Sequence, residues 1–462
     1  MIRFENIKKY LVNGSIGSRQ KVSLFGSIHH YTSSTEGSKN RIHLRIDPDG
    51  SGVLIVNANH LYHLNPSATK MAYLTLEKIP EIEIIRQLGS EFNAPRNQIQ
   101  TDYTSFNFQL QGLVKPSNAC PICDYELETT TPFSHSPSAP YRMDLAITYR
   151  CNNECSHCYN GRSRNQPELN TDSWKEILNK LWGYGIPHIV FTGGEPTLRQ
   201  DLPVLINCAE SLGQITGLNT NGRRLKDRGY VQELSVAGLD HIQITLESHI
   251  KSIHDRLVER NGAWEDTNRG IQNVLQQNVF VMTNTTLLRE NSGQLKDTLE
   301  YLGSLGVPTI GLNALIYSGA GRNVGTGLAE SELPKLLDIA REVTDRYKQR
   351  LIWYTPTQYC HFDPVQMELG VKGCTAALYN MCIEPEGSVI PCQSYYSSLG
   401  NILNNDWASI WNHPLAIQLR ERNNLPEKCS GCTLIGECGG GCPLAINQLD
   451  PVPEYFISEA FR

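Results

Sequence analysis

The sequence has 462 residues, of which 40% are hydrophobic and 19% charged, and its formal net charge is −6 at pH 7. A chain of this length is too long for one ordinary core, so we expect two or three domains. The acidic balance argues against nucleic acid as a partner, and no apolar run approaches the roughly 18 residues of a membrane span. Because residues 1–10 are charged and lack the apolar core of a secretory signal, we expect a cytoplasmic protein.

The 14 cysteines need an explanation other than disulfides, because the cytoplasm keeps thiols reduced. Most of them fall into three groups: Cys120 with Cys123, three within residues 151–158, and seven within residues 374–442. The remaining two, Cys208 and Cys360, stand apart. Groups with this spacing in a cytoplasmic chain indicate metal sites.

Residues 1–115 predict a small domain in which strands are followed by three short helices. Asn65 is a suitable N-cap for the first helix, and Pro66 suits its first position. The expected elements, in chain order, are a loop at 32–40, a hairpin of 41–47 and 52–57, a short strand from 61, and helices at 66–77, 80–92 and from about 99 to 114. This order predicts a winged-helix-like domain.

Residues 116–140 are rich in proline, serine and threonine and predict a linker. The linker contains Cys120-Pro121-Ile122-Cys123, which is half of a metal site, or a redox pair if it opened a helix. Pro121 and the absence of a thioredoxin-like context argue against the redox pair. Two alternatives stay open: the pair contributes thiolates to another site, or it forms half of a zinc site.

Residues 141–350 alternate short apolar runs with helical patterns. We expect strands at 143–148, 188–192, 214–219, 241–246, 279–285 and 309–314, and helices at 171–184, 202–212, 230–237, 264–277, 293–305 and 331–348. Six strands alternating with helices predict a parallel sheet with right-handed crossovers, curled into a partial (β/α)6 barrel of the TIM type. In such folds the active site lies at the carboxyl ends of the strands.

Three cysteines, Cys151, Cys155 and Cys158, follow the first of these strands. They are one short of the four thiolates that normally hold an iron–sulfur cluster. An iron without a protein ligand is free to bind a substrate or cofactor. A zinc site with His157 as the fourth ligand is the alternative.

The next strand ends in Gly193-Gly194-Glu195-Pro196. Two glycines allow the backbone to approach a ligand closely, and the carboxylate beside them is suited to an ammonium group. The third strand ends in Asn219-Thr220-Asn221 and the fourth reaches Glu247, so polar groups meet at the same edge. These strand ends are too alike to indicate a catalytic acid or base.

The cysteine spacing, the aromatic Tyr159 after it and the Gly-Gly-Glu-Pro motif one strand later resemble the radical S-adenosylmethionine (SAM) enzymes. The resemblance implies a 4Fe–4S cluster at the three cysteines, which chelates SAM and reduces it to a 5′-deoxyadenosyl radical. His157 then only fills the loop. The resemblance further implies that SAM and substrate are contacted by Gly193, Gly194, Glu195, Pro196, Asn219, Thr220, Asn221 and Glu247.

The C-terminal cysteines resemble the SPASM extension of these enzymes, which we expect over residues 351–462 and which carries two auxiliary 4Fe–4S clusters. The resemblance implies that the first cluster is held by Cys374, Cys382, Cys392 and Cys442, and the second by Cys429, Cys432 and Cys438. The family usually has an eighth cysteine, and none follows Cys442. The fourth position of the second cluster is therefore open, or filled by Asp450, Glu454, Glu459, Cys360, Cys120 or Cys123. Paired zinc ribbons are the alternative for this region.

The N-terminal domain resembles the PqqD-like peptide-recognition domain of ribosomal peptide maturases, which binds a leader peptide as an added strand. A DNA-binding winged helix is the alternative, but its basic residues are scattered rather than clustered. The resemblance thus implies a maturase that modifies a ribosomally made peptide by hydrogen abstraction, forming a thioether or carbon–carbon cross-link. The resemblance also implies a reductant such as flavodoxin or ferredoxin as a partner. We expect neither nucleic acid nor a membrane as a partner.

Three other functions remain open at this point. One is a SPASM enzyme that acts on a folded protein, as a sulfatase-maturing dehydrogenase does. Another is a peptide epimerase, which needs a hydrogen donor. The third is a zinc-ribbon interaction protein without enzymatic activity.

Overall fold

The computed structural model describes residues 27–35, 38–57, 60–92, 94–113, 137–423 and 425–449. The chain divides into two compact units: the residues up to Ser138 together with Leu181–Pro187, and Ala139–Lys180 together with the residues from His188. Several residues considered as ligands lie outside the described part of the chain, namely Cys120, Cys123, Asp450, Glu454 and Glu459. Within the described residues, no helix is long and apolar enough to cross a membrane.

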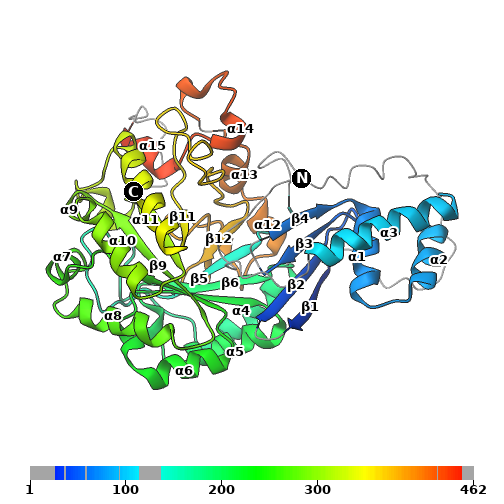
Figure 1. Cartoon of the computed structure of the whole chain (residues 1–462), viewed down its shortest axis with the longest axis horizontal. Coiled ribbons are helices and arrows are strands. Elements are labelled where there is room, and N and C mark those ends of the chain that lie inside the picture. Colours follow the sequence, from blue (N-terminus) through cyan, green and yellow to red (C-terminus); the bar gives the residue numbers. More distant parts are fainter. Residues whose placement is uncertain are drawn as a thin grey trace. The chain divides into compact units, whose positions relative to one another are not determined.

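The first unit is a four-stranded antiparallel sheet followed by three helices (Figure 1). Its elements are β1 (Ser27–Thr35), β2 (Ser38–Ile46), β3 (Gly52–Val56), β4 (His60–Leu64), α1 (Pro66–Leu76), α2 (Glu81–Glu91) and α3 (Arg96–Leu113). The Asn65 side chain caps α1 by accepting a hydrogen bond from the Ala68 N–H at 2.9 Å, as predicted. The predicted hairpin is β2 with β3.

A single apolar core joins the sheet of this unit to its helices. Leu44 of β2 and Leu54 of β3 are buried against Met71 of α1, Leu88 of α2 and Leu110 of α3. The strands are ordered β1-β2-β3-β4, so β1 and β4 are the two edges of the sheet.

The prediction of a loop over residues 32–40 is wrong. β1 extends to Thr35 and pairs along its length with β2, which begins at Ser38. The sequence of β1, SIHHYTSST, carries no apolar alternation that would mark a strand. Residues 27–35 form a strand because they pair with the apolar strand β2, so tertiary context overrides local propensity here.

The second unit is built on a ten-stranded sheet with the order β11-β10-β9-β8-β7-β6-β5-β12-β13-β14. The six predicted strands form its consecutive parallel part: β5 (Arg142–Thr148), β6 (His188–Gly193), β7 (Ile215–Thr220), β8 (His241–Thr245), β9 (Phe280–Leu287) and β10 (Thr309–Ala314). The predicted parallel α/β fold is confirmed, and β10 begins and ends at the residues predicted for that strand.

Helices connect these strands as the alternating pattern predicts. They are α4 (Thr171–Gly183), α5 (Leu202–Leu212), α6 (Arg228–Ala237), α7 (Lys251–Leu257), α8 (Ala263–Val274), α9 (Arg289–Ser292), α10 (Leu295–Ser304) and α11 (Leu333–Tyr347). The buried faces of these helices carry apolar side chains, such as Leu205 of α5 and Ile271 of α8. The short helices α7 and α9 were not predicted.

Two further parallel strands extend the sheet beyond the prediction. β11 (Arg350–Trp353) pairs with β10, and β12 (Asn380–Ile383) pairs with β5 from the other side. They cover strand edges that would otherwise expose unpaired backbone groups. β12 belongs to the cysteine-rich region, so that region continues the same sheet.

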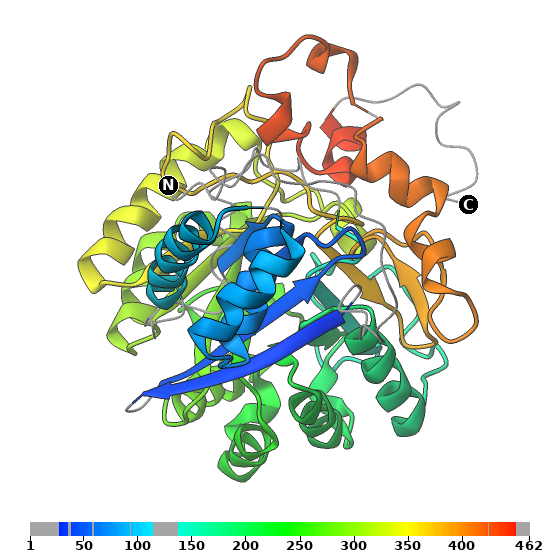
Figure 2. The ribbon, with the colours of Figure 1, turned by 90° about the vertical axis from the view of Figure 1, so that its right-hand side faces the viewer.

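In the C-terminal region, β12 pairs antiparallel with β13 (Ser388–Ile390), and β13 pairs antiparallel with β14 (Gly400–Asn401). The remaining helices are α12 (Trp407–Trp411), α13 (Pro414–Arg420), α14 (Ile435–Cys438) and α15 (Pro443–Leu449). Figure 2 shows this orange-to-red segment on the opposite side of the unit from the green helices α5, α6 and α8.

Candidate active site

The loop after β5 carries Cys151, Cys155 and Cys158, which are not joined in disulfides. Burial raises the pKa of Cys151 to about 11, and burial also raises the pKa values of Cys155 and Cys158. Their charges act on one another, so the three sulfurs are neighbours. Thiols in this environment bind metal only as thiolates, so metal binding releases protons.

The described residues contain no group of three His, Cys, Asp or Glu side chains set around a single ion. A 4Fe–4S cluster makes a different demand, because each cysteine binds a separate iron and the sulfurs stand further apart. The Nε2 atom of His157 is hydrogen-bonded to Glu247, and its Nδ1 atom is not part of any such group among the described residues. The donor set, three neighbouring thiols in one loop, fits the cluster better than zinc.

Backbone hydrogen bonds attach the cysteine loop to the end of α7. The N–H of Glu154 donates to the carbonyl of Val258 at 3.0 Å, and the N–H of Ser156 donates to that of Leu257 at 3.1 Å. The N–H of Asn153 donates to Cys151 Sγ at 3.4 Å. The loop conformation is therefore held by the fold itself.

Arginines, for which the sequence pattern predicted no role, surround the same loop. Arg164 donates to the carbonyls of Cys151 at 3.1 Å and Asn153 at 2.7 Å. Arg223 donates to the carbonyl of Asn152 at 2.7 Å. Their positive charge favours thiolates beside them. Arg164 follows Cys158 by six residues, and this proximity in sequence was the available clue.

Gly193 and Gly194 lie directly against the chain that enters the cysteine loop. The N–H of Gly194 donates to the carbonyl of Thr148 at 2.8 Å. Gly193 has φ 132°, and a Cβ there would overlap the Thr148 carbonyl oxygen; a Cβ at Gly194 would overlap that of Arg150. The glycines were expected to approach a ligand, and the structure shows that they approach the backbone of β5.

Glu195 is fully buried and its carboxylate is occupied by the protein. Oε1 accepts from the Thr197 N–H at 3.1 Å, the Thr197 hydroxyl at 2.6 Å and the Thr220 hydroxyl at 2.6 Å; Oε2 accepts from the Asn221 N–H at 2.8 Å. Burial raises the pKa of Glu195, while these four hydrogen bonds oppose that shift. Pro196 begins the short 3-10 helix η2 (Pro196–Leu198) that presents Thr197. Glu195 thus ties β6 to β7.

The end of β7 contributes two kinds of polar group. The Asn221 amide donates to Asn152 Oδ1 at 2.7 Å and lies 4.0 Å from Cys151 Sγ. Asn219 is half-buried, and its side chain has no hydrogen bond to any described residue. Asn221 therefore holds the cysteine loop, whereas Asn219 remains available to a bound molecule.

Glu247, beyond the end of β8, connects the loop to β9. Its Oε1 lies 2.9 Å from His157 Nε2, and its Oε2 accepts from the Thr286 N–H at 2.9 Å. The Glu247 N–H donates to Nδ1 of His254 at 3.2 Å, and burial lowers the pKa of His254, which keeps that ring neutral. His157, expected only to fill the loop, has a specific partner.

A glycine-rich segment after β10 closes on the other side of the loop. The N–H of Gly321 donates to the carbonyl of Cys158 at 3.2 Å. A Cβ at Gly319 would lie 2.6 Å from the carbonyl oxygen of Asn160 and 2.7 Å from that of Cys158. Strand ends from β6, β7, β8 and β10 thus converge on one loop.

The first predicted auxiliary group lies beside β5. Cys382 of β12 is opposite Asp144 of β5 in the parallel register. Burial, followed by the charges of Cys442 and Cys392, raises the pKa of Cys374, and burial raises the pKa of Cys392 to about 12. Among the four predicted thiols, the charges of Cys442 and Cys392 thus act on Cys374, and that of Cys392 acts on Cys382.

A polar bridge joins the two cysteine regions. Arg162, four residues after Cys158, forms a bidentate ion pair with Glu384 at 2.7 and 3.0 Å. The Tyr149 hydroxyl donates to the same carboxylate at 3.0 Å. Tyr149, Cys382 and Tyr396 also share a small apolar cluster. The loop of the first site is thus fixed against the hairpin that carries Cys382.

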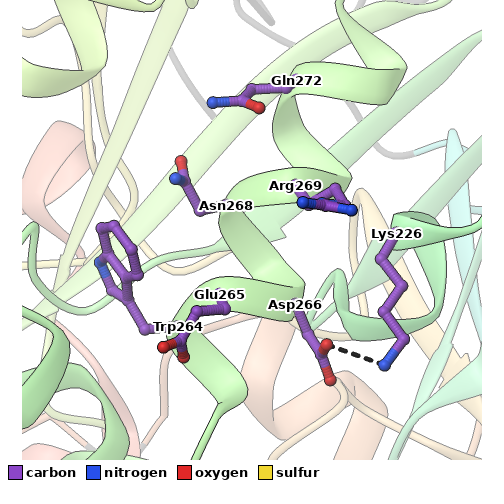
Figure 3. A pocket seen from close by; sticks show the side chains of 7 residues that line it. All are labelled: Lys226, Trp264, Glu265, Asp266, Asn268, Arg269 and Gln272. Carbon is purple, nitrogen blue, oxygen red and sulfur yellow. Dashed lines mark hydrogen bonds and ion pairs between the residues drawn. The ribbon is translucent and has the colours of Figure 1, made fainter.

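A separate depression of about 280 Å³ lies on the outer surface of α8 (Figure 3). In Figure 3, Arg269 and Asp266 lie on the side of α8 nearer Lys226, whose Nζ atom lies 2.8 Å from Asp266 Oδ1, while Trp264, Asn268 and Gln272 point to the other side. None of the predicted site residues lines it, and we assign it no ligand.

Comparisons with known proteins identify two domains in the chain. A family model described as the radical SAM superfamily matches residues 145–302, and a model described as the SPASM iron–sulfur cluster-binding domain matches residues 374–433. The chain is 29% identical over 314 residues to PqqA peptide cyclase of Bradyrhizobium diazoefficiens, which covers 66% of this chain and 81% of that protein. It is 26% identical over 325 residues to Fe-coproporphyrin III synthase of Methanosarcina barkeri, which covers 64% and 81%.

Among solved structures, Streptococcus suis SuiB bound to precursor peptide SuiA has a similar fold, with a TM-score of 0.65 at 15% identity, covering 90% of this chain and 97% of that chain. The chain therefore carries a radical SAM domain, which uses SAM and a 4Fe–4S cluster, followed by a SPASM domain, which holds auxiliary iron–sulfur clusters.

Proposed function

We propose that this protein is a cytoplasmic radical SAM enzyme that modifies a ribosomally made peptide. The observation that carries this proposal is the extent of its likeness to SuiB, whose structure contains a precursor peptide. That likeness spans 90% of the chain, whereas the sequence matches to the two curated relatives span 64% and 66%. The 10% of the chain that does not match SuiB is smaller than the N-terminal unit. The match to SuiB therefore includes part of that unit.

In this proposal the cluster held by Cys151, Cys155 and Cys158 and the bound SAM together supply a 5′-deoxyadenosyl radical, which abstracts a hydrogen from the peptide. The chain holds the cysteine loop, positions the peptide and excludes water. The Glu195 carboxylate already accepts four hydrogen bonds, about as many as its lone pairs allow. We therefore assign Glu195 to positioning and the contact with SAM to the backbone of residues 193–196.

The remaining assignments extend the same proposal. Asn219, Thr220, Asn221 and Glu247 line the carboxyl edge on which SAM and substrate lie. The N-terminal domain (1–115) binds the leader peptide as an added strand at one of its sheet edges, β1 or β4. A linker (116–140) leads to the barrel (141–350) and the SPASM domain (351–462). A flavodoxin or ferredoxin supplies the electron.

We propose a cross-link, thioether or carbon–carbon, as the product. Forming a bond between two groups that each lose a hydrogen is a two-electron oxidation, and the auxiliary clusters are suited to accept the electron that remains after hydrogen abstraction. The bridge between the cysteine loop and the Cys382 hairpin holds the first auxiliary site close to the SAM cluster.

The test is co-expression with short peptides encoded beside the gene, followed by mass analysis of the peptide. Cross-linking removes two hydrogens per bond, whereas epimerisation leaves the mass unchanged. Cys151→Ala should abolish the change, and the matched control Cys208→Ala should not. A peptide of identical mass and stereochemistry from wild type and Cys151→Ala would overturn the proposal and favour a folded protein or a tetrapyrrole as the substrate.

A further inference from the structure

The second auxiliary group has three cysteines close in sequence, Cys429, Cys432 and Cys438, and no cysteine follows Cys442. A 4Fe–4S cluster normally has four thiolate ligands. The identity of the fourth ligand decides whether one iron is open to a substrate. The described residues near Cys438 indicate where that ligand lies.

The segment that precedes Cys360 lies directly against Cys438. The N–H of Tyr359 donates to Cys438 Sγ at 3.4 Å, and the Cys438 thiol donates to the carbonyl of Thr357 at 3.6 Å. On the far side, a Cβ at Gly441 would lie 3.0 Å from Gln358 Cγ and 3.3 Å from Gln358 N. Backbone on the N-terminal side of Cys360 is thus packed on the cysteine group, although about 80 residues separate them.

Contacts on both sides of Cys360 hold this segment in place. Glu330 accepts from the Gln358 N–H at 3.4 Å and pairs with His361 Nδ1 at 2.5 Å. The Tyr359 hydroxyl accepts from the Lys372 N–H at 2.9 Å. Cys360 itself is exposed, and its thiol makes only a long contact of 3.9 Å with Gln358 Oε1. Its sulfur is therefore accessible on a fixed backbone.

We propose that Cys360 supplies the fourth thiolate of the second auxiliary cluster. This inference rests on the proposed assignment of Cys429, Cys432 and Cys438 to that cluster. With four thiolates every iron has a protein ligand, so the cluster transfers electrons and does not bind substrate. The ligand comes from the segment between β11 and β12, ahead of the first SPASM cysteine, rather than from the C-terminus.

The first experiment measures the protection of each cysteine from alkylation in the full chain. The protein is treated with iodoacetamide anaerobically, once with reconstituted clusters and once without iron, and the sites are mapped by mass spectrometry. We expect Cys360 to be alkylated without iron and protected with clusters, while Cys208 reacts equally in both. Equal alkylation of Cys360 in the two samples would overturn the inference.

The second experiment compares Cys360→Ala with the matched control Cys208→Ala by iron content and electron paramagnetic resonance. Three 4Fe–4S clusters contain about twelve irons. We expect Cys360→Ala either to lose about four of them or to keep them with an altered spectrum, and Cys208→Ala to match wild type. A wild-type spectrum and iron content in Cys360→Ala would contradict the inference.

Two further variants separate the possible failures. If the double variant Cys120→Ala/Cys123→Ala alters the iron content or the spectrum and Cys360→Ala does not, the fourth ligand lies in the linker and the inference is wrong. A triple alanine variant at Cys429, Cys432 and Cys438 that keeps all of its iron would overturn the second cluster itself, and with it the proposed assignment. If the triple variant loses iron but Cys360→Ala has the iron content and spectrum of wild type, only the inference about Cys360 is overturned.

Discussion

The Nε2 atom of His157 lies 2.9 Å from Oε1 of Glu247, which joins the middle of the cysteine loop to the residue two beyond the end of β8. The Glu247 side chain is completely buried and that of His157 is 9% exposed. Burial opposes a charge on His157, but the Glu247 carboxylate outweighs it, so the pKa of His157 is raised. The raised pKa favours an ion pair between His157 and Glu247.

We predict that this pair stabilises the loop measurably. His157→Phe, Glu247→Gln and the double variant form a double-mutant cycle, to be measured by anaerobic urea unfolding. A hydrogen bond with a charged group contributes about 1.5–3 kcal/mol, so a coupling energy of at least about 1 kcal/mol is expected. Additive effects of the two substitutions would show that the contact does not hold the loop.

The glycines of the Gly-Gly-Glu-Pro motif should affect cluster loading. Gly193→Ala and Gly194→Ala place a Cβ on the carbonyl oxygens of Thr148 and Arg150, so the cysteine loop must shift. We expect loss of about four of about twelve irons, with the auxiliary clusters retained. Iron analysis and electron paramagnetic resonance measure this.

Gly293→Ala is the matched control for the two motif glycines, because nothing lies within 4 Å of a Cβ at Gly293. It should load iron as wild type does. Full cluster loading in Gly193→Ala and Gly194→Ala would show that the motif serves only to bind SAM.

Removing Arg162 should destabilise the contact between the cysteine loop and the SPASM hairpin. The Glu384 side chain is 1% exposed, so Arg162→Ala leaves a buried carboxylate without its bidentate partner. Breaking a buried ion pair costs about 3–5 kcal/mol, and we expect the lower end because a third of Arg162 is exposed. Chemical denaturation measures the loss.

Arg346→Ala provides the comparison for Arg162→Ala. Its ion pairs with Glu300 and Glu342 are exposed, and such pairs contribute about 1 kcal/mol or less. If the two substitutions had equal effects on the free energy of unfolding, the buried ion pair would have no special role.

Stability should fall in mild acid because of His241. Burial, and then the charge of Arg142, lowers the pKa of His241 to about 3, whereas the unfolded chain has a value of about 6.5. Between these values the unfolded state binds the extra proton, so the contribution is complete above pH 6.5 and is lost as the pH falls. The expected loss is about 1.4 kcal/mol between pH 7.5 and 5.5.

The comparison for this effect is His241→Gln, measured by anaerobic urea unfolding at the two pH values. Other groups titrate in the same range, so the difference between wild type and variant isolates His241. Between pH 7.5 and 5.5, the free energy of unfolding of the variant should fall by about 1.4 kcal/mol less than that of wild type. Identical pH dependence in the two proteins would contradict the lowered pKa.

Local sequence patterns were sufficient to predict most of the strands and helices of the second unit. Apolar runs of five to seven residues between helical patterns predicted β5 to β10, and α5 agrees with its prediction at both ends. The strands β11 and β12 escaped prediction because each has only four residues. Their pairing with β10 and β5 depends on the edges that the finished sheet offers.

The sequence by itself determined the chemistry of the first site. Three cysteines at close spacing after a strand, and Gly193-Gly194-Glu195-Pro196 one strand later, are local features that require no fold to be recognised. Cys151, Cys155 and Cys158 are brought together by the loop that contains them. Short-range spacing is sufficient wherever the ligands share one loop.

Only the tertiary structure decided what holds that loop. The glycines face the backbone of β5, the Glu195 carboxylate is occupied by β7 and η2, and His157 meets Glu247 from 90 residues away. The segment that carries Cys360 meets Cys438 in the same way, through the N–H of Tyr359. Local patterns predict that the parallel strands bring their carboxyl ends to one edge, but they do not specify which side chains pair with one another there.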